Sequence, residues 1–235
     1  MDGLIYYPTI SNDEKLKTYF LKRIGCHSER TLSSAKVLDI AHDAWKKCLE
    51  TATPKAIVRL TQVEEIKEDN IYAQGISIES SLWAGLAKNA SNPLTLAVFA
   101  LTLGSNLSQE TLNAQKHSLS ESYILHEAGS IIIENAADHL ETMIREIPDL
   151  KNLTSSRRFS PGYCDIPLLN QNAFFQFLVP ETIGIQMMGS GGMRPEKSIT
   201  AAMLFSNRLP DIFPCLDCRN DKCQHRRGKR KETGP

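Results

Sequence analysis

Apolar and polar positions near the start of the chain alternate with a helical period and predict two helices. Residues 11–24 begin with a capping serine and acidic side chains, continue with apolar residues three or four positions apart, and precede Gly25, a helix-stop residue. The same spacing predicts a second helix over residues 33–52. Trp45 and Cys48 lie on its apolar face, so we expect both to be core residues.

The pattern then changes to short runs that are typical of strands. Strands are expected at residues 56–60, 70–73 and 76–78, with residues 62–69 as a connection, and a short helix follows at residues 81–88. Leu94–Thr102 is apolar at almost every position, which predicts a strand buried on both faces.

A long apolar stripe marks the middle of the chain. A helix is predicted to begin near Ser108, and residues 120–146 carry the longest helical pattern, with a wide apolar face. Gly129 interrupts this face, which indicates close packing against a neighbouring element. Glu134 lies beside the stripe, so it is a candidate for a partly buried acidic group that needs a partner.

An irregular loop is predicted at residues 157–167. Pro161 and Pro167 lack a backbone N–H and disfavour helix before them, and Gly162 permits backbone shapes that other residues avoid. The loop brings together a guanidinium, a hydroxyl, a phenol and a thiol. Composition alone favours an ordinary surface loop, so any function assigned to it needs further support.

A short helix and a hairpin are predicted after this loop. Residues 172–178 form an amphipathic helix, and residues 182–188 and 198–205 are expected to pair as strands around a turn. The glycine-rich turn, residues 189–192, lacks the Gly-Lys-Ser/Thr ending of a phosphate-binding loop, and no helix follows it. We therefore exclude a nucleoside-triphosphate site there.

The composition limits the class of protein. A chain of 235 residues forms one domain, or at most two small ones. We assign residues 1–213 to one domain, with the helices of residues 11–52 as a subregion, and residues 214–235 to a cysteine-rich, basic tail. Lys plus Arg and Asp plus Glu both number 27, so no overall charge draws the chain to nucleic acid or membrane. No signal-peptide or membrane-spanning pattern is present, and the expected location is the cytoplasm.

Cysteine spacing in the tail points to a metal. Cys215 and Cys218 are separated by two residues, and Cys223 can close the site from the other side. The fourth ligand is either His225 or Cys164. Zinc accepts both sets, whereas an iron–sulfur cluster favours the four cysteines. The alternative is that these thiols are reduced and bind nothing.

Several short motifs occur together in one order. They are Leu101–Gly104, Glu127–Ala136, Arg158–Tyr163, Ile183–Ile185 and Met193–Thr200. Their order and spacing resemble stand-alone proteins similar to the activation (reactivation) domain of cobalamin-dependent methionine synthase. Each motif alone is weak, but the ordered set is fairly specific and covers roughly the last two-thirds of the chain.

The resemblance implies both a fold and a function. The fold is α+β, with a twisted, largely antiparallel sheet and surrounding helices. The function is that of an S-adenosylmethionine-binding accessory subunit in methionine biosynthesis. It would support reductive remethylation of the cobalamin (vitamin B12) on a methionine synthase, or on another corrinoid methyltransferase, acting in trans. A flavodoxin or ferredoxin-type protein would supply the electron, and whether the chain itself counts as an enzyme is left open.

The resemblance also implies site residues. The implied S-adenosylmethionine site comprises Glu134, Arg158, Phe159, Ser160, Pro161, Gly162, Tyr163 and Ser190. Arg158 would bind the ligand carboxylate through its planar fork, and Glu134 would be a buried acidic partner. Tyr163 would face the corrin and take the catalytic role. Met188–Ser190 lacks an acidic residue of the family, and Met203 replaces an aromatic one, which favours a different corrinoid partner.

Two other functions are compatible with parts of the sequence. The first is a metal-binding interaction or regulatory protein whose S-adenosylmethionine loop is vestigial. The second is an independent S-adenosylmethionine methyltransferase, which the absence of a glycine-rich strand–loop–helix signature makes the weakest of the three.

Overall fold

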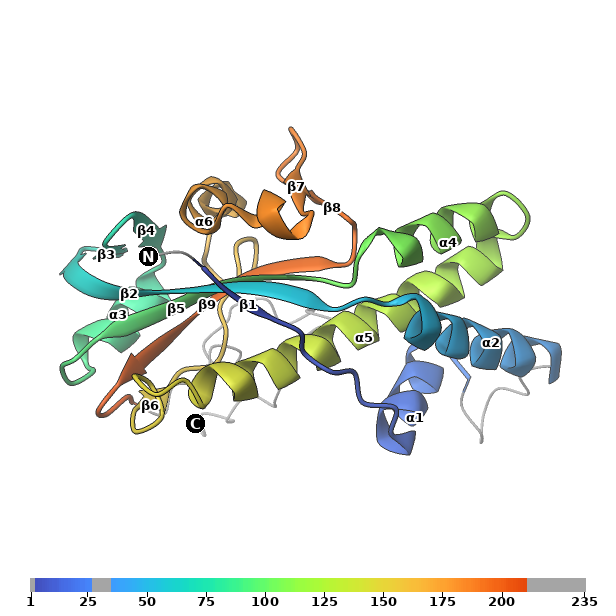
Figure 1. Ribbon diagram of the computed structural model, residues 1–235, viewed down its shortest axis with the longest axis horizontal. Coiled ribbons are helices and arrows are strands. Elements are labelled where there is room, and N and C mark those ends of the chain that lie inside the picture. The colour runs from blue at the N-terminus through green and yellow to red at the C-terminus, as the bar shows by residue number, and fades with distance from the viewer. Residues whose placement is uncertain (1–2, 27–34, 211–235) are drawn as a thin grey trace, which may run out of the picture.

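One twisted antiparallel sheet organises the chain (Figure 1). The computed structural model describes residues 3–26 and 35–210. The strands are β1 Leu4–Tyr6, β2 Lys55–Lys67, β3 Asn70–Ala73, β4 Ile76–Glu79, β5 Thr95–Thr102, β6 Thr154–Ser155 and β9 Ser198–Ser206. Their order across the sheet is β4-β3-β2-β5-β9-β6, and β1 pairs with the first part of β2. A separate hairpin pairs β7, Gln186–Met187, with β8, Met193–Arg194.

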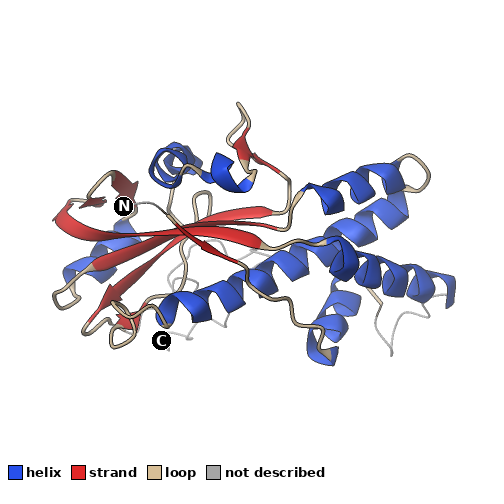
Figure 2. Cartoon of the chain, viewed as in Figure 1, coloured by secondary structure: helices blue, strands red, loops and turns tan. Residues whose placement is uncertain are grey.

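Helices cover both faces of this sheet, as Figure 2 shows. They are α1 Glu14–Arg23, α2 Ala35–Thr51, α3 Ser81–Lys88, α4 Ser105–Gln115, α5 Leu119–Arg145 and α6 Gln171–Leu178, with short 3-10 turns at Leu168–Asn170 and Pro180–Ile183. The predicted α+β class, with a twisted antiparallel sheet and surrounding helices, is confirmed. Within the described part of the chain, no helix has the length and apolar character needed to cross a membrane.

Polar side chains cap the starts of three helices, although the cap of α1 is Asp13 and not the serine expected at position 11. Asp13 accepts a hydrogen bond from the backbone N–H of Leu16 at the start of α1, over 2.7 Å. Ser80 and Ser118 cap α3 and α5 in the same way. Each cap satisfies an N–H group that has no partner inside its helix.

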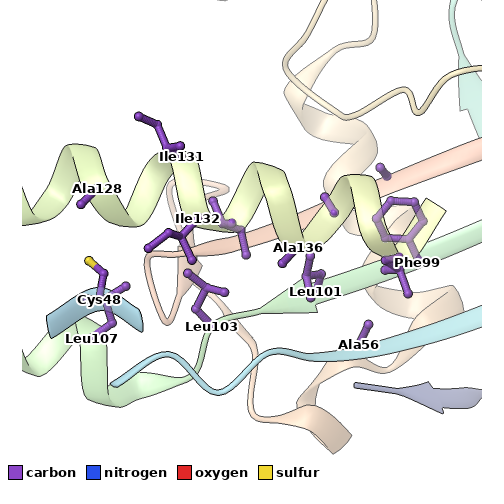
Figure 3. Close-up of a cluster of buried hydrophobic side chains, with 14 of the residues drawn as sticks. Cys48, Ala56, Phe99, Leu101, Leu103, Leu107, Ala128, Ile131, Ile132 and Ala136 are labelled. Carbon is purple, nitrogen blue, oxygen red and sulfur yellow. The ribbon is translucent and has the colours of Figure 1, made fainter. Parts of the chain in front are cut away.

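The central strand β5 is buried on both faces, as predicted. Its alternate side chains belong to two separate cores, one against α5, α2, α1 and α4, and one against α3 and α6. Figure 3 shows the first core, where Leu101 and Leu103 face Ala136 and Ile132 of α5. Cys48 also lies in this core, where burial raises the pKa of its thiol to about 12, so it is an unreactive apolar group.

Gly129 packs as closely as predicted. A Cβ placed on this residue would lie 3.0 Å from Cδ2 of Leu107 and 3.1 Å from Cε of Lys197. The glycine therefore lets α4 and the segment before β9 approach the middle of α5.

Three predictions about element limits are wrong. Residues 182–188 do not pair with β9, because Pro180 starts a 3-10 turn and Gly184 has a φ of 83°, which interrupts an extended strand. Both sides of β9 instead pair with β5 and β6. Residues 62–69 are not a simple connection, since β2 continues through a bulge to Lys67. The helix expected from Ser108 already begins at Ser105.

Gly129→Ala and Gly85→Ala are predicted to change stability differently. Alanine is favoured over glycine inside a helix by about 1 kcal/mol. A Cβ at Gly85 of α3 would meet no heavy atom within 4 Å, so we expect this variant to be more stable. At Gly129 the crowding described above should cancel this gain. The free energy of unfolding of Gly129→Ala should therefore be about 1–2 kcal/mol lower than that of Gly85→Ala. Urea unfolding followed by circular dichroism tests this, and equal gains would mean that Gly129 is not crowded.

Candidate functional site

The outer edge of β9 is only partly covered. β6 pairs with the end of the strand, at Phe205 and Ser206. Phe159 then exchanges two backbone hydrogen bonds with Ala202, each of 2.9 Å, and the chain leaves the sheet. Because hydrogen-bonding direction alternates along an antiparallel strand, the N–H and C=O of Thr200 point to the same side as those of Ala202. That side opens into a cleft.

The cleft has a volume of about 900 Å³ and is built from segments far apart in sequence. Its walls are one face of α5, residues 157–161, 163 and 164 of the loop, the turn of the β7–β8 hairpin, the start of β9 and part of α1. The helix face supplies Ser130, Glu134, Asp138 and Glu141, which recur at helical spacing.

Two buried contacts hold the loop of residues 157–167 in place. The ring of Phe159 stacks on Trp83, with ring centres 4.9 Å apart, in the core below the sheet edge. Asp165 accepts hydrogen bonds from Ser80 Oγ, over 2.7 Å, and from the backbone N–H of Leu82, over 2.9 Å. The loop is thereby tied to β9 and to the start of α3.

The tip of the loop is a tight turn with polar groups at the cleft. Gly162 has a φ of 83° and donates its N–H to the carbonyl of Ile166, over 2.9 Å. Ser160, Pro161, Tyr163 and Cys164 all line the cleft, and the Tyr163 side chain is exposed. The loop thus presents backbone and side-chain groups from a fixed frame.

Some predicted residues take other positions. Phe159 is among the residues that line the cleft, but it is buried and its ring lies in the core. Ser190 is exposed in the hairpin turn, and its neighbours Gly191 and Gly192 line the cleft instead. Glu134 is not buried, because 45% of its side chain is exposed.

Arg158 connects the loop to α5 through three carboxylates. Its Nη2 lies 2.6 Å from Glu134 Oε2, and its Nη1 lies 2.7 Å from Asp138 Oδ1 and also contacts Glu141. Only 10% of the Arg158 side chain is exposed, and the same is true of Glu141. Burial alone would lower the pKa of Arg158, but the charges of these carboxylates raise it, so the guanidinium stays charged.

The α5 wall presents three carboxylates to the cleft. Arg158 contacts all three, and Arg157 also lines the cleft. The second carboxylate oxygen of Glu141 is held by Arg145 over 2.8 Å, outside the cleft. A cationic ligand group at Glu134 and Asp138 is therefore favoured.

Sequence reasoning missed Asp138, Glu141 and Asp165. The first two follow Glu134 at four and seven positions, which places them on one helix face. This spacing was a usable signal. Asp165 could not be assigned, because its partners come from α3, more than eighty residues earlier. Lys197, which lines the cleft from the segment before β9, was also missed.

The predicted metal ligands Cys215, Cys218, Cys223 and His225 lie outside the described residues. Cys164 is exposed in the loop. Within residues 3–26 and 35–210, no group of three or more His, Cys, Asp or Glu side chains is placed to hold a metal ion. The metal site in the tail stays a prediction.

The fold is that of the methionine synthase reactivation domain. The chain is similar to a crystal structure of the MetH reactivation domain bound to AdoHcy, with a TM-score of 0.62 and 15% sequence identity. The match covers 90% of this chain and 80% of that one. No family model matches the sequence, and neither does any curated protein. At this identity the likeness establishes the architecture and confirms the predicted fold.

Asp165→Ala is predicted to loosen the loop. It leaves Ser80 Oγ and the Leu82 N–H without their acceptor, which should lower the free energy of unfolding by about 1–3 kcal/mol. Amide hydrogen exchange in residues 160–166 should also become faster. Asp149→Ala, at an exposed aspartate, is the control. Equal stability and exchange in the two variants would show that Asp165 does not hold the loop.

Proposed function

We propose that the chain binds S-adenosylmethionine in this cleft and supports reductive remethylation of cobalamin on a partner protein. The observation that carries the proposal is the acidic α5 wall facing a fixed loop at an open strand edge. The fold adds support, because the similar MetH reactivation domain is bound to AdoHcy, the demethylated form of this ligand.

The charges of the cleft suit the ligand. S-adenosylmethionine carries a sulfonium and an ammonium, and Glu134 and Asp138 offer negative charge to both. The backbone N–H and C=O of Thr200 offer one donor and one acceptor to the polar edge of an adenine ring. Ser160 lines the wall of the cleft opposite α5, and Gly162 forms the turn of the loop behind that wall. The proposed site therefore keeps both residues, together with Arg158, Pro161 and Tyr163.

The proposed chemistry requires positioning rather than proton transfer. A flavodoxin- or ferredoxin-type donor supplies one electron, and the methyl group passes from the sulfonium to the reduced cobalt of the partner, leaving AdoHcy. The chain contributes by holding the ligand with its methyl group directed out of the cleft. This role needs no nucleophile or general base from the chain.

The rim of the cleft suits a protein partner that carries a corrinoid. Tyr163, Leu168 and Leu169 are exposed beside the cleft, with 53%, 48% and 79% of their surfaces accessible. Exposed apolar side chains grouped in this way are typical of interaction surfaces. We propose that Tyr163 contacts the corrin face, on a methionine synthase or a related corrinoid methyltransferase.

A metal-binding interaction protein with a vestigial loop remains the alternative. It predicts no binding of S-adenosylmethionine, even at millimolar concentration. The preformed cleft and the ionic link between Arg158 and α5 favour the first proposal.

Arg158→Ala is predicted to weaken S-adenosylmethionine binding at least about tenfold, which corresponds to about 1.4 kcal/mol. The loop would lose its ionic link to α5, and three carboxylates would lose their shared cation. Arg145→Ala is a matched control, since Arg145 also pairs with Glu141 but lies outside the cleft. Isothermal titration calorimetry compares the two variants. Equal affinity of Arg158→Ala and the wild type, with unchanged circular dichroism, would contradict the site.

Tyr163→Ala is predicted to slow reactivation more than it weakens ligand binding. The side chain is exposed at the rim, so its ring can act on the docked partner rather than on the buried part of the ligand. The test measures methylcobalamin formation on an inactivated corrinoid partner, with S-adenosylmethionine and an electron donor present, and Tyr163→Phe separates the ring from the hydroxyl. Wild-type rates for both variants would limit Tyr163 to a structural role.

A further inference from the structure

Leu168 lies between two turns that are far apart in sequence, at the rim of the cleft. It begins the 3-10 turn Leu168–Asn170 and lines the cleft, and 48% of its surface is exposed. One turn is the tip of the loop at Gly162, and the other is the tip of the β7–β8 hairpin at Gly191. Both glycines have a positive φ, 83° and 81°, so both turns have a backbone shape that other residues rarely adopt.

The side chain of Leu168 packs on both turns. A Cβ placed on Gly162 would lie 3.4 Å from Cδ1 of Leu168, and a Cβ on Gly191 would lie 3.3 Å from Cδ2 and 3.4 Å from Cγ. Chain neighbours aside, no other residue in the described part of the chain has a heavy atom within 4 Å of either position. The two turns therefore share one packing partner, and each branch of the leucine covers one of them.

Backbone hydrogen bonds shape each turn separately. The N–H of Gly162 donates to the carbonyl of Ile166, and the N–H of Gly191 donates to the carbonyl of Met188, each over 2.9 Å. Both bonds close a turn on itself and do not join one turn to the other. The packing of Leu168, in contrast, connects the two turns directly.

The backbone that carries Leu168 is anchored on its buried side. Gln171 follows three residues later, and only 3% of it is exposed. Its side-chain amide donates to Sδ of Met193 in β8, over 3.3 Å, and accepts from the hydroxyl of Thr200 in β9, over 2.9 Å. These bonds tie the segment to the sheet and to the base of the hairpin, so Leu168 projects from a fixed support.

We infer that Leu168 is a positioning residue that holds the loop turn and the hairpin turn at a fixed separation. Pro161 and Tyr163 of the first turn line the cleft, as do Gly191 and Gly192 of the second, so this separation determines how closely the cleft encloses a ligand. The inference rests on the proposed function and adds a residue that controls ligand retention through the two turns.

Leu168→Ala tests this inference through the dissociation rate of AdoHcy, measured by surface plasmon resonance. Removing the shared packing partner should raise this rate at least about threefold. Leu168→Met keeps a long apolar side chain and should restore most of the wild-type rate. Leu112→Ala is the matched control, because Leu112 lies on α4, is 55% exposed and is not among the residues that line the cleft. It should release AdoHcy as the wild type does.

Amide hydrogen exchange without ligand separates positioning from a general loss of stability. In Leu168→Ala, the amides of Gly162 and Gly191 should both exchange faster, because each is hydrogen-bonded inside a turn that has lost its packing partner. Exchange at Ile132, in the core face of α5, should not change. A leucine that only added to overall stability would not affect these two turns selectively.

The outcomes separate this inference from the proposed function. The inference is wrong if Leu168→Ala releases AdoHcy at the wild-type rate, or if only one of the two turns exchanges faster. It is also wrong if α5 exchanges faster by the same factor as the turns. A wild type that does not bind AdoHcy would instead remove the proposed function, and this inference with it.

Discussion

The pairing of the loop with β9 stops at Phe159, and the site depends on where it stops. An exposed strand edge has unsatisfied backbone groups and is normally covered. Here β6 and Phe159 cover the end of β9, and the loop then turns away so that the edge at Thr200 faces the cleft. The stacking of Phe159 on Trp83 and the contacts of Asp165 with α3 determine the course of the loop. The fold thereby makes part of a sheet edge one wall of a cleft.

The charges of the cleft follow from the helix that crosses this edge. Ser130, Glu134, Asp138 and Glu141 lie on one face of α5, so the loop and the segment before β9 meet the same row of side chains. Arg158 binds the acidic end of that row, and Lys197 binds the neutral end. The opposite face of α5 is packed against the sheet, as Figure 3 shows for Ile132 and Ala136. The walls of the cleft are therefore formed by elements that the core holds in place.

Local patterns were sufficient to predict most of the fold, but not the arrangement of the site. The apolar run in β5, the long helix α5 and the crowding at Gly129 follow from residue spacing, and the structure has all three. The predicted strand at residues 182–188 was wrong, because Pro180 and Gly184 outweigh its apolar pattern. The loop was recognised by its motif, whereas the partners of Arg158, Asp165 and Lys197 depend on tertiary contacts. Long-range pairing of this kind has no local signature in a single sequence.

Hydrogen exchange with and without AdoHcy tests the central claim most directly, because it locates the ligand on the chain. The account predicts slower exchange of backbone amides in residues 158–163 and at Thr200, where the loop and the open edge of β9 face the cleft. Exchange in α3 and in the β3–β4 hairpin, which lie outside the cleft lining, should not change. Unchanged exchange in the loop at saturating AdoHcy, or protection confined to another surface, would contradict the assignment of this cleft as the ligand site.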